Sequence, residues 1–371
     1  MKIDLEKSSF LSALGIAVRG VSTRSAVQTL AGVMLKVDGG QLELQATDLE
    51  LGVRARVDVN VDRDGSAVVP GRLLLDVVRS LPGDRATLEY RSSQGDVEVV
   101  SGPARFHLRT LPAEEFPRLP EAGDASVVKL PAESFVETVN RVARAASRDE
   151  TRPHLTGVLV SASERQLRMV ATDSYRLSVK ETPLDAPVEG SLEANVPART
   201  LQELGRITSS TQPEEIAIAS LEHQVIFSSG GVALSSRLVE GRFPNYQQLL
   251  PESFEHQLRI STPELLEVVR RISLLAQKNA PLRMRFSEGT LDVSAQTPDI
   301  GEATESLPVP FKGEQLEIGF NPDFLREGLE SAESEEVTLK LISPLRPGLI
   351  EASGDGPGSF MYLVMPIRLN V

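Results

Sequence analysis

Two aspartates stand at matching places in this chain and could be taken for a catalytic pair of carboxylates. Asp48 follows Ala46-Thr47, and Asp173 follows Ala171-Thr172 about 125 residues later. Two carboxylates in different environments can divide the work of a general acid and a general base. Both aspartates, however, come at the end of an expected strand inside a repeated segment. We therefore expect a structural role at a turn.

Other residue types that do chemistry are absent or badly spaced. The chain has no Cys and no phosphate-binding P-loop, and its four histidines lack metal-ligand spacing: His107, His154, His223 and His256. Gly354, Gly356 and Gly358 match part of a dinucleotide-binding fingerprint, but they precede an expected strand instead of a helix. We interpret these glycines as a turn. The sequence therefore predicts a protein that is not an enzyme and needs no cofactor or metal.

Arginines gather on one side of several expected helices. At 100° per residue, a helix over 132–147 places Phe135, Val139, Val142 and Ala146 together on a core face. Arg141, Arg144 and Arg148 fall on the opposite side. The expected second helices repeat this pattern, with Arg72 and Arg79 in one copy and Arg199 and Arg206 in the next.

Arginine on one exposed helix face is ordinary, but its recurrence is informative. Five of the six expected helices carry outward Arg or Lys although the chain has a net charge of −13. The sixth departs, because Asp323 and Glu330 stand where the pattern predicts Arg. Segregated basic charge in an acidic chain favours a surface that faces a polyanion.

The positions of these residues repeat along the chain. Val69-Pro70-Gly71-Arg72 returns as Val196-Pro197-Ala198-Arg199, and Phe116-Pro117 returns as Phe243-Pro244, each about 127 residues later. A fainter third copy follows. A period this long predicts three whole domains instead of a solenoid.

Each copy is predicted to contain two helices and several strands. In the first copy, a helical face begins at Phe10 and a second helix covers 72–81. Helices over 132–147 and 198–209 are expected in the second copy. In the third, Thr262-Pro263 predicts an N-cap with a first-turn proline, and another helix covers 322–332. Strands are expected at 32–37, 41–46, 52–59, 85–91, 96–100, 104–111 and 360–365.

Composition bounds the remaining possibilities. Apolar residues make up 40% of the 371 residues, which is enough for a core in each copy, and no apolar run approaches the roughly 18 residues of a membrane span. The N-terminal residues lack the apolar run of a signal peptide. With no Cys for disulfides, we expect a cytoplasmic protein without a membrane partner.

Four motifs, in this order and at these spacings, carry a resemblance over the whole chain: Ala46-Thr47-Asp48-Leu49-Glu50, Ala171-Thr172-Asp173 followed by Arg176-Leu177, Glu240-Gly241-Arg242-Phe243-Pro244, and Met365-Pro366-Ile367-Arg368-Leu369. The chain resembles the bacterial DNA polymerase III beta subunit family, the replicative sliding clamps. The resemblance implies an α+β fold of three tandem DNA-clamp domains, each with two helices and about eight strands, at residues 1–122, 123–253 and 254–371. It also implies a head-to-tail homodimer whose six domains form a ring, with helices inside and sheets outside.

Helix geometry agrees with such a ring. Twelve helices about 9 Å apart give a circumference of roughly 110 Å and about 35 Å between opposite axes. Removing a helix diameter of about 10 Å leaves a bore of roughly 25 Å. A duplex that passes through this bore is contacted at its phosphates, without sequence preference. Arg24 matches a DNA-contacting position of the family, and the full set of predicted DNA-binding residues is Arg24, Arg72, Arg79, Arg144, Arg148, Arg199, Arg206 and Lys278.

The family also binds a short partner peptide between its second and third domains. The corresponding pocket positions here are Leu155, Thr172, Ser174, Tyr175, Arg176, Leu177, Pro244, Leu249, Val364, Met365, Pro366, Ile367 and Arg368. Ser174-Tyr175 and Ile367 replace the family's frequent Gly-His and second Met. The implied partners are the replicative polymerase catalytic subunit, the clamp loader and other proteins with a clamp-binding motif.

The family's apolar dimer contacts correspond to Phe106, Leu274 and Leu275. Leu274 stands where Arg144 stands in the second copy, which is expected if this surface is buried against a partner. The alternative is that Leu274 packs within its own domain. For the whole protein, the alternative function is a peptide-binding scaffold that encircles nothing.

Overall fold

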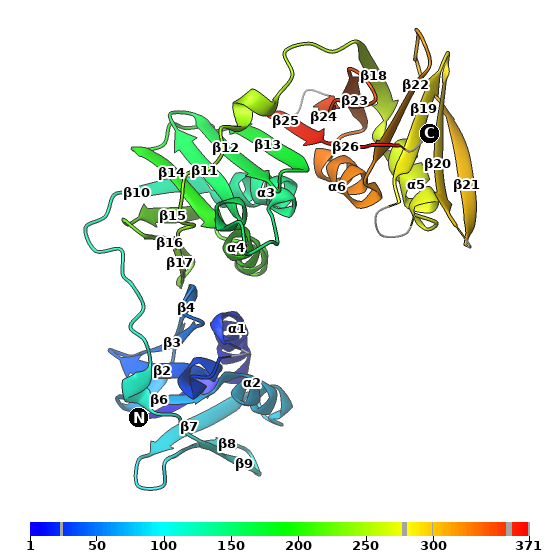
Figure 1. The fold of residues 1–371 in the computed structure, drawn as a ribbon. Helices are drawn as coiled ribbons and strands as arrows, with labels where there is room; N and C mark the ends of the chain where they lie inside the picture. The colour runs from blue at the N-terminus through cyan, green and yellow to red at the C-terminus, as the bar shows by residue number, and fades with distance from the viewer. Residues whose placement is uncertain (23–24, 277–279, 299, 354–357, 370–371) are drawn as a thin grey trace. The chain divides into compact units, whose positions relative to one another are not determined.

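The computed structural model describes residues 1–22, 25–276, 280–298, 300–353 and 358–369, and these form two compact units (Figure 1). Unit 1 comprises residues 1–132 and 203–238, and unit 2 comprises residues 133–202 and 239–371. Neither unit coincides with one sequence repeat, because in each unit a sheet continues from one repeat into the next.

Unit 1 contains two antiparallel sheets and the helices α1 (Lys7–Ala17) and α2 (Gly71–Ser80), which pack on each other. The five-stranded sheet has the order β5 (Asn60–Arg63), β1 (Lys2–Glu6), β7 (Arg85–Arg91), β8 (Asp96–Ser101) and β9 (Ala104–Arg109). The eight-stranded sheet has the order β10 (Val127–Pro131), β15 (Glu215–Ser220), β16 (Gln224–Ser229), β17 (Val232–Arg237), β4 (Leu51–Asp58), β3 (Gln41–Thr47), β2 (Gly32–Asp38) and β6 (Gly65–Pro70).

Unit 2 is built on the same plan, with α3 (Ala132–Val142), α5 (Thr262–Ser273) and α6 (Pro322–Ala332). Helix α4 (Ala198–Thr211) begins in unit 2 and ends in unit 1. The eight-stranded sheet has the order β14 (Ser191–Pro197), β11 (Gly157–Ser163), β12 (Gln166–Thr172), β13 (Arg176–Pro183), β25 (Ser359–Val364), β24 (Gly348–Ser353), β23 (Glu336–Leu341) and β18 (His256–Ser261). The five-stranded sheet has the order β21 (Gly301–Pro308), β20 (Thr290–Thr297), β19 (Leu282–Ser287), β22 (Leu316–Phe320) and β26 (Pro366–Ile367).

One strand pair in each unit joins neighbouring repeats. In unit 1, β4 of the first repeat pairs with β17 of the second, with Leu51 opposite Ser236. In unit 2, β13 of the second repeat pairs with β25 of the third, with Arg176 opposite Val364. These pairings place residues that are almost 190 positions apart side by side, at the same point of the repeated pattern.

The expected elements agree with the structure in kind and differ at their ends. The expected helix at 322–332 and the expected strand at 85–91 have the observed bounds. The helix expected to reach Ser147 ends at Val142, because the chain tightens there into a 3₁₀ turn over Ala143–Ala145. The N-cap of α5 is Ser261, not Thr262. The strand expected to reach Leu111 ends at Arg109, and Leu111 forms an isolated bridge to Val68.

The cores rest on aliphatic side chains with a few aromatic rings, as the composition indicates. Phe10 and Leu14 of α1 are fully buried in unit 1. In unit 2, a Cβ at Gly328 of α6 would come within 2.5 Å of the Tyr362 ring, so glycine lets this helix lie directly on β25. No helix within the described residues has the length and apolar character needed to cross a bilayer.

Candidate functional site

The turn between β12 and β13 is closed by the side chains of Thr172 and Asp173. Thr172 Oγ1 donates to the carbonyl of Arg176 at 2.6 Å and accepts from the N–H of Ser174 at 3.2 Å. Asp173 Oδ1 accepts from the N–H groups of Tyr175 at 2.9 Å and of Arg176 at 3.0 Å. Ser174 has a φ of 79°, in the left-handed region that favours glycine. Asp173 therefore holds a turn, in agreement with its place in the repeat.

The turn between β3 and β4 has the same construction. Thr47 Oγ1 donates to the carbonyl of Leu51 at 2.9 Å, and Asp48 Oδ1 accepts from the N–H groups of Glu50 and Leu51 at 3.1 and 2.8 Å. Leu49, the counterpart of Ser174, also has a φ of 79°. The repeated Thr-Asp motif thus encodes a hairpin whose backbone donors are held by two short side chains.

Arg176 connects this hairpin to the rest of unit 2. Its guanidinium forms ion pairs with Asp173 (3.1 Å) and Glu327, and it donates to the Arg144 carbonyl at 2.7 Å and to the Tyr362 hydroxyl at 3.3 Å. Burial disfavours the charged guanidinium, but Tyr362 and Glu327 more than offset this cost and raise its pKa above the usual value. Arg176 therefore fixes the hairpin from within.

Part of the predicted pocket set meets at the joint between β13 and β25, where Arg176 lies opposite Val364. The backbone N–H of Met365 donates to the carbonyl of Tyr175 at 2.8 Å, which brings the end of β25 to the hairpin. Of the predicted pocket residues, Leu155, Thr172, Leu177 and Val364 are buried. Tyr175, Leu249 and Met365, which we call the apolar rim, are exposed by 59%, 49% and 40%. The other predicted pocket residues apart from Arg176 are half-buried or exposed: Ser174, Pro244, Pro366, Ile367 and Arg368.

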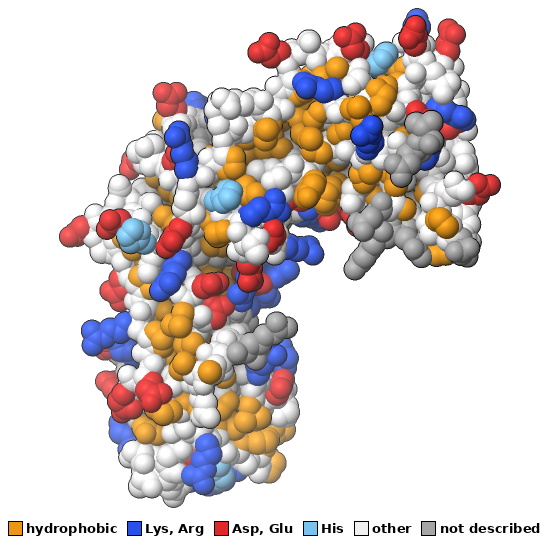
Figure 2. Space-filling model, in the orientation of Figure 1, with side chains coloured by type: hydrophobic (Ala, Val, Ile, Leu, Met, Phe, Trp, Pro, Cys, Tyr) orange, Lys and Arg blue, Asp and Glu red, His pale blue; other side chains and the backbone are white. Residues whose placement is uncertain are grey.

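Leu177 belongs to an apolar cluster that packs against the segment after β17. Leu177, Leu349 and Leu363 are among its buried members, and Phe243 and Tyr246 pack against it. Figure 2 shows hydrophobic side chains gathered over the part of unit 2 that holds β24 and β25. An apolar surface with a few fixed polar groups suits a short peptide with apolar anchors.

Sequence reasoning missed two residues of this site. Phe324 of α6 stacks on Tyr175 with ring centroids 6.5 Å apart, and the Arg176 guanidinium lies 4.4 Å from the centre of the same ring. Arg152 donates to Ser174 Oγ at 3.1 Å. In the sequence, Phe324 only follows Asp323 in an expected helix, and no local pattern marks it as a partner of Tyr175. Only the tertiary fold brings α6 to the hairpin.

The predicted DNA-binding arginines lie on exposed surfaces but differ in their partners. Arg79 pairs with Asp76 (3.7 Å), Arg144 with Glu330 (2.9 Å) and Arg206 with Glu203. Within the part of the chain that the structure describes, the guanidinium groups of Arg72 and Arg148 form no ion pair or hydrogen bond. Arg199 is also exposed. Arg24 and Lys278 lie outside the described residues.

One arginine expected on the outward face is instead buried. Arg141 is 8% exposed, and its guanidinium donates to the carbonyls of Ser331 and Ala332 at the end of α6. It also pairs with Glu137 at 3.0 Å. The outward interpretation of Arg141 is wrong because α6 supplies buried acceptors on that side of α3.

Glu330 on α6, which stands where the repeated pattern predicts Arg, also has a structural role. Glu330 accepts from Arg144 at 2.9 Å and from Arg270 at 3.0 Å, so it joins three helices of unit 2. The side-chain hydrogen bond to Glu330 raises the pKa of Arg270. A carboxylate at this position therefore neutralises two neighbouring arginines.

The predicted dimer contacts lie near sheet edges. Phe106 is half-buried on β9, which ends the five-stranded sheet of unit 1. Leu274 is 83% exposed, so it does not pack within its own domain. Leu275 is half-buried beside β21, the edge of the five-stranded sheet of unit 2, and Ile300 is exposed close to it. Ile300 is an apolar surface residue that the sequence analysis missed.

The other candidate chemistry residues do not form a site. Among the described residues, no three His, Asp or Glu side chains are grouped as metal ligands. Gly358 has a φ of 81° directly before β25, which agrees with a turn, while Gly354 and Gly356 lie outside the described residues.

Comparison with known proteins extends over the whole chain. Three family models match in order: the DNA polymerase III beta subunit N-terminal domain at residues 1–120, its central domain at 129–245 and its C-terminal domain at 247–368. The beta sliding clamp of Streptomyces coelicolor is 34% identical, with 100% of both chains covered. The beta sliding clamp of Synechococcus elongatus is 33% identical, also over 100% of both chains.

Solved structures agree with this match. The DNA polymerase sliding clamp of Bacillus subtilis superposes with a TM-score of 0.93 at 27% identity, and the DNA polymerase III subunit beta of Pseudomonas aeruginosa with 0.91 at 30%. Both comparisons cover 100% of each chain. The predicted three tandem clamp domains are therefore confirmed. This chain belongs to the DNA polymerase III beta subunit family, the bacterial sliding clamps.

Proposed function

We propose that two copies of this chain close head to tail into a ring that encircles duplex DNA and tethers the replicative polymerase to it. The observation that carries this proposal is the match to all three clamp domains, in order and over the full length. It favours a clamp over a peptide-binding scaffold that encircles nothing. We place the domain boundaries at residues 1–122, 123–253 and 254–371.

Two sheet edges support ring closure. β9 and β21 are the outermost strands of their sheets, so each presents unpaired backbone groups. β9 carries the exposed Arg105 and Arg109, whereas β21 carries Glu302 and Glu305. Pairing β9 of one copy with β21 of the other would join opposite charges and bury the apolar patch around Leu274. A head-to-tail contact of this kind closes into a ring when it is repeated twice.

The exposed arginines support sequence-neutral contact with DNA. Guanidinium groups bind phosphate oxygens, and such contacts carry no sequence information directly. Arg72 and Arg148 are available to phosphates at once, because no carboxylate among the described residues neutralises them. Arg79, Arg144 and Arg206 must first exchange an acidic partner. Arg24, Arg199 and Lys278 complete the proposed DNA-binding set.

The unit 2 pocket supports the tethering role. The apolar rim of Tyr175, Leu249 and Met365 fits the apolar anchors of a short peptide. The hydrogen bond from Arg152 to Ser174 Oγ holds two polar side chains beside Tyr175. We propose the polymerase catalytic subunit, the clamp loader and other clamp-binding proteins as partners. The protein would act in the cytoplasm as a mechanical tether without catalysing a reaction.

A primer-extension assay tests this function. With a clamp loader and polymerase on a primed circular template, the protein should lengthen the products made in one binding event. The double variant Leu249→Asp, Met365→Asp should lose this effect, because two charges would enter an apolar rim. Both side chains are exposed, so the fold and the dimer should persist. Product lengths that do not depend on the protein would overturn the proposal.

A further inference from the structure

Unit 1 contains a pocket at the place that corresponds, one repeat earlier, to the peptide pocket of unit 2. The strand registers establish the correspondence. Gly52 lies opposite Ser235, as Leu177 lies opposite Leu363. The N–H of Arg237 donates to the carbonyl of Glu50 at 3.1 Å, as the N–H of Met365 donates to that of Tyr175 at 2.8 Å.

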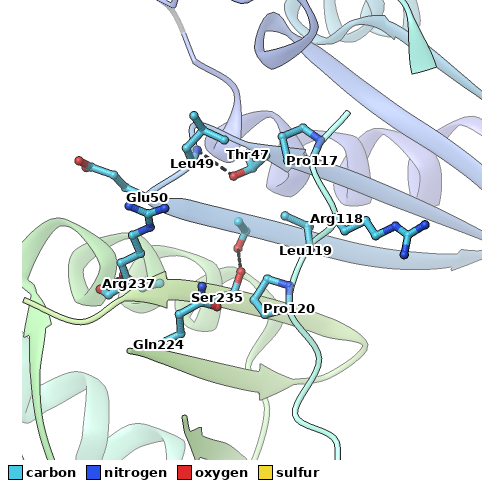
Figure 3. Close-up of a pocket in the computed structure, with 12 residues that line it drawn as sticks. Thr47, Leu49, Glu50, Pro117, Arg118, Leu119, Pro120, Gln224, Ser235 and Arg237 are labelled. Carbon is cyan, nitrogen blue, oxygen red and sulfur yellow. Dashed lines mark hydrogen bonds between the residues drawn. The ribbon is translucent and has the colours of Figure 1, made fainter. Parts of the chain in front are cut away.

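The unit 1 pocket has a volume of about 210 Å³. The Thr-Asp hairpin forms one wall with Thr47, Leu49 and Glu50, and β16 and β17 contribute Gln224, Ser235 and Arg237. The segment 117–120 runs along the other side (Figure 3). This volume admits a single side chain with some of its backbone, and is small for an extended ligand.

The backbone plan is shared with unit 2, but the side chains have different chemistry. By register, Gly52, Ser235 and Arg237 replace Leu177, Leu363 and Met365. A Cβ at position 52 would lie 2.8 Å from Leu119 Cδ2, so Leu119 covers the place that a larger side chain would fill. The unit 1 pocket keeps the hydrogen-bonded framework but has a glycine and two polar residues in place of these three apolar side chains, and its walls are largely polar.

The charges of this pocket favour an acidic ligand. Across the described ranges, the Arg237 and Arg118 guanidiniums form no ion pair or hydrogen bond. Nearby Arg54 and Arg56, by contrast, both pair with Glu43. In Figure 3, Arg237 lies on the hairpin side next to Glu50, and Arg118 points away from it. Arg237 is therefore the cation placed to meet a ligand, and Arg118 adds positive charge beside the pocket.

We propose that this pocket is a second peptide site, which takes a short segment with an acidic side chain. The ligand carboxylate meets Arg237, and Gln224 offers hydrogen bonds to the peptide backbone. The Ser235 hydroxyl donates to the Gly52 carbonyl at 3.5 Å, so it can only accept from the peptide. Glu50, which lines the pocket, would repel the successive phosphates of a nucleic acid, so a nucleic acid is the less favourable ligand. The inference deepens the proposed function, because it rests on the assignment of the corresponding unit 2 pocket to peptides.

Selection from a random hexapeptide library displayed on phage tests the proposal, because it requires no candidate ligand at the start. The full chain is the target, and the Arg237→Gln variant is used for counter-selection. Sequences with Asp or Glu should be enriched, and their synthetic peptides should bind Arg237→Gln about tenfold more weakly, as expected for a lost charge-assisted contact. Glu50→Gln should strengthen the same binding, since it removes the opposing charge.

Matched controls separate this site from the unit 2 pocket. Met365→Gln changes the residue that corresponds to Arg237, and should weaken a polymerase-derived peptide while leaving the acidic peptides unaffected. Loss of the acidic peptides in Met365→Gln, or no enrichment of acidic sequences over Arg237→Gln, would overturn the second site. A polymerase peptide that binds Met365→Gln normally would instead count against the unit 2 assignment. A further result would also contradict the proposal: the selection yields no peptide, and Arg237→Gln abolishes binding to duplex DNA. The pocket would then be a DNA contact instead of a peptide site.

Discussion

At the scale of single residues, Arg176 shows how one buried cation can organise a binding site. Its partners come from four segments: Asp173 in the hairpin, the Arg144 carbonyl after α3, Glu327 on α6 and the Tyr362 hydroxyl on β25. Its repeat counterpart, Leu51, is apolar and buried, so the first hairpin is held without this charge. The hairpin of unit 2 is therefore held by an ion-pair network that the hairpin of unit 1 lacks.

Replacing Arg176 with leucine should destabilise this part of unit 2. The change leaves Asp173 and Glu327 without their cation, and breaking a buried pair in this way costs roughly 3 kcal/mol. Hydrogen exchange should show the loss as faster exchange of the hairpin and α6 amides. Adding Glu327→Gln should recover part of it, because the two positions are coupled. Unchanged exchange in the single variant would contradict the network.

The sequence allowed some residue roles to be predicted and concealed others. The role of Asp48 and Asp173 followed from local pattern, because a Thr-Asp turn uses only neighbouring backbone groups. The burial of Arg141 could not be predicted from helical periodicity, since its acceptors lie 190 residues away on α6. The contact between Phe324 and Tyr175 could not be predicted either, because it also joins distant segments. Local chemistry can be inferred along the chain, whereas packing between elements requires the fold.

At the scale of elements, the helices and the turns after them differ in whether their exposed arginines already form ion pairs with carboxylates. Arg72 on α2 and Arg148 after α3 lack ion-pair partners among the described residues, while Arg79 and Arg206 have i,i+3 carboxylates. Helix periodicity predicted the exposure of all four. It could not predict their pairing, which depends on the side-chain rotamers.

The double variant Arg72→Gln, Arg148→Gln should weaken DNA binding more than Arg79→Gln, Arg206→Gln. Each lost phosphate contact should reduce the slope of log K against log salt concentration by about 1. Both double variants remove two positive charges. The comparison therefore tests only whether an arginine without an ion-pair partner binds phosphate more readily than a paired one. Equal losses from both pairs would show that the ion pairs do not restrain Arg79 and Arg206.

The sheets illustrate what sequence could not reveal at this scale. The seven strands predicted by residue range lie within two residues of their observed bounds, but the joining of β4 to β17 and of β13 to β25 was not predicted. Such pairings link distant segments, and alternation of apolar residues does not identify the partner strand. The second pocket could therefore not be predicted either, because it is formed by one of these joints.

At the scale of the whole molecule, the account requires two copies. Leu274 is exposed by 83% at the end of α5 and would be buried at the proposed β9 to β21 contact. Leu274→Asp should therefore convert the dimer to a monomer, measured as solution mass by light scattering, without lowering the melting temperature. Leu345→Asp is the matched control, since Leu345 is 64% exposed elsewhere in unit 2. A dimer that survives Leu274→Asp would refute this contact.

Encirclement is tested most directly by cutting the DNA after loading. The protein is loaded onto a nicked circular duplex by a clamp loader, separated from free protein, and the circle is then linearised with a restriction enzyme. The account predicts that the protein stays on the intact circle and leaves the linear DNA by sliding off its ends. Equal retention on circular and linear DNA would contradict a topological link.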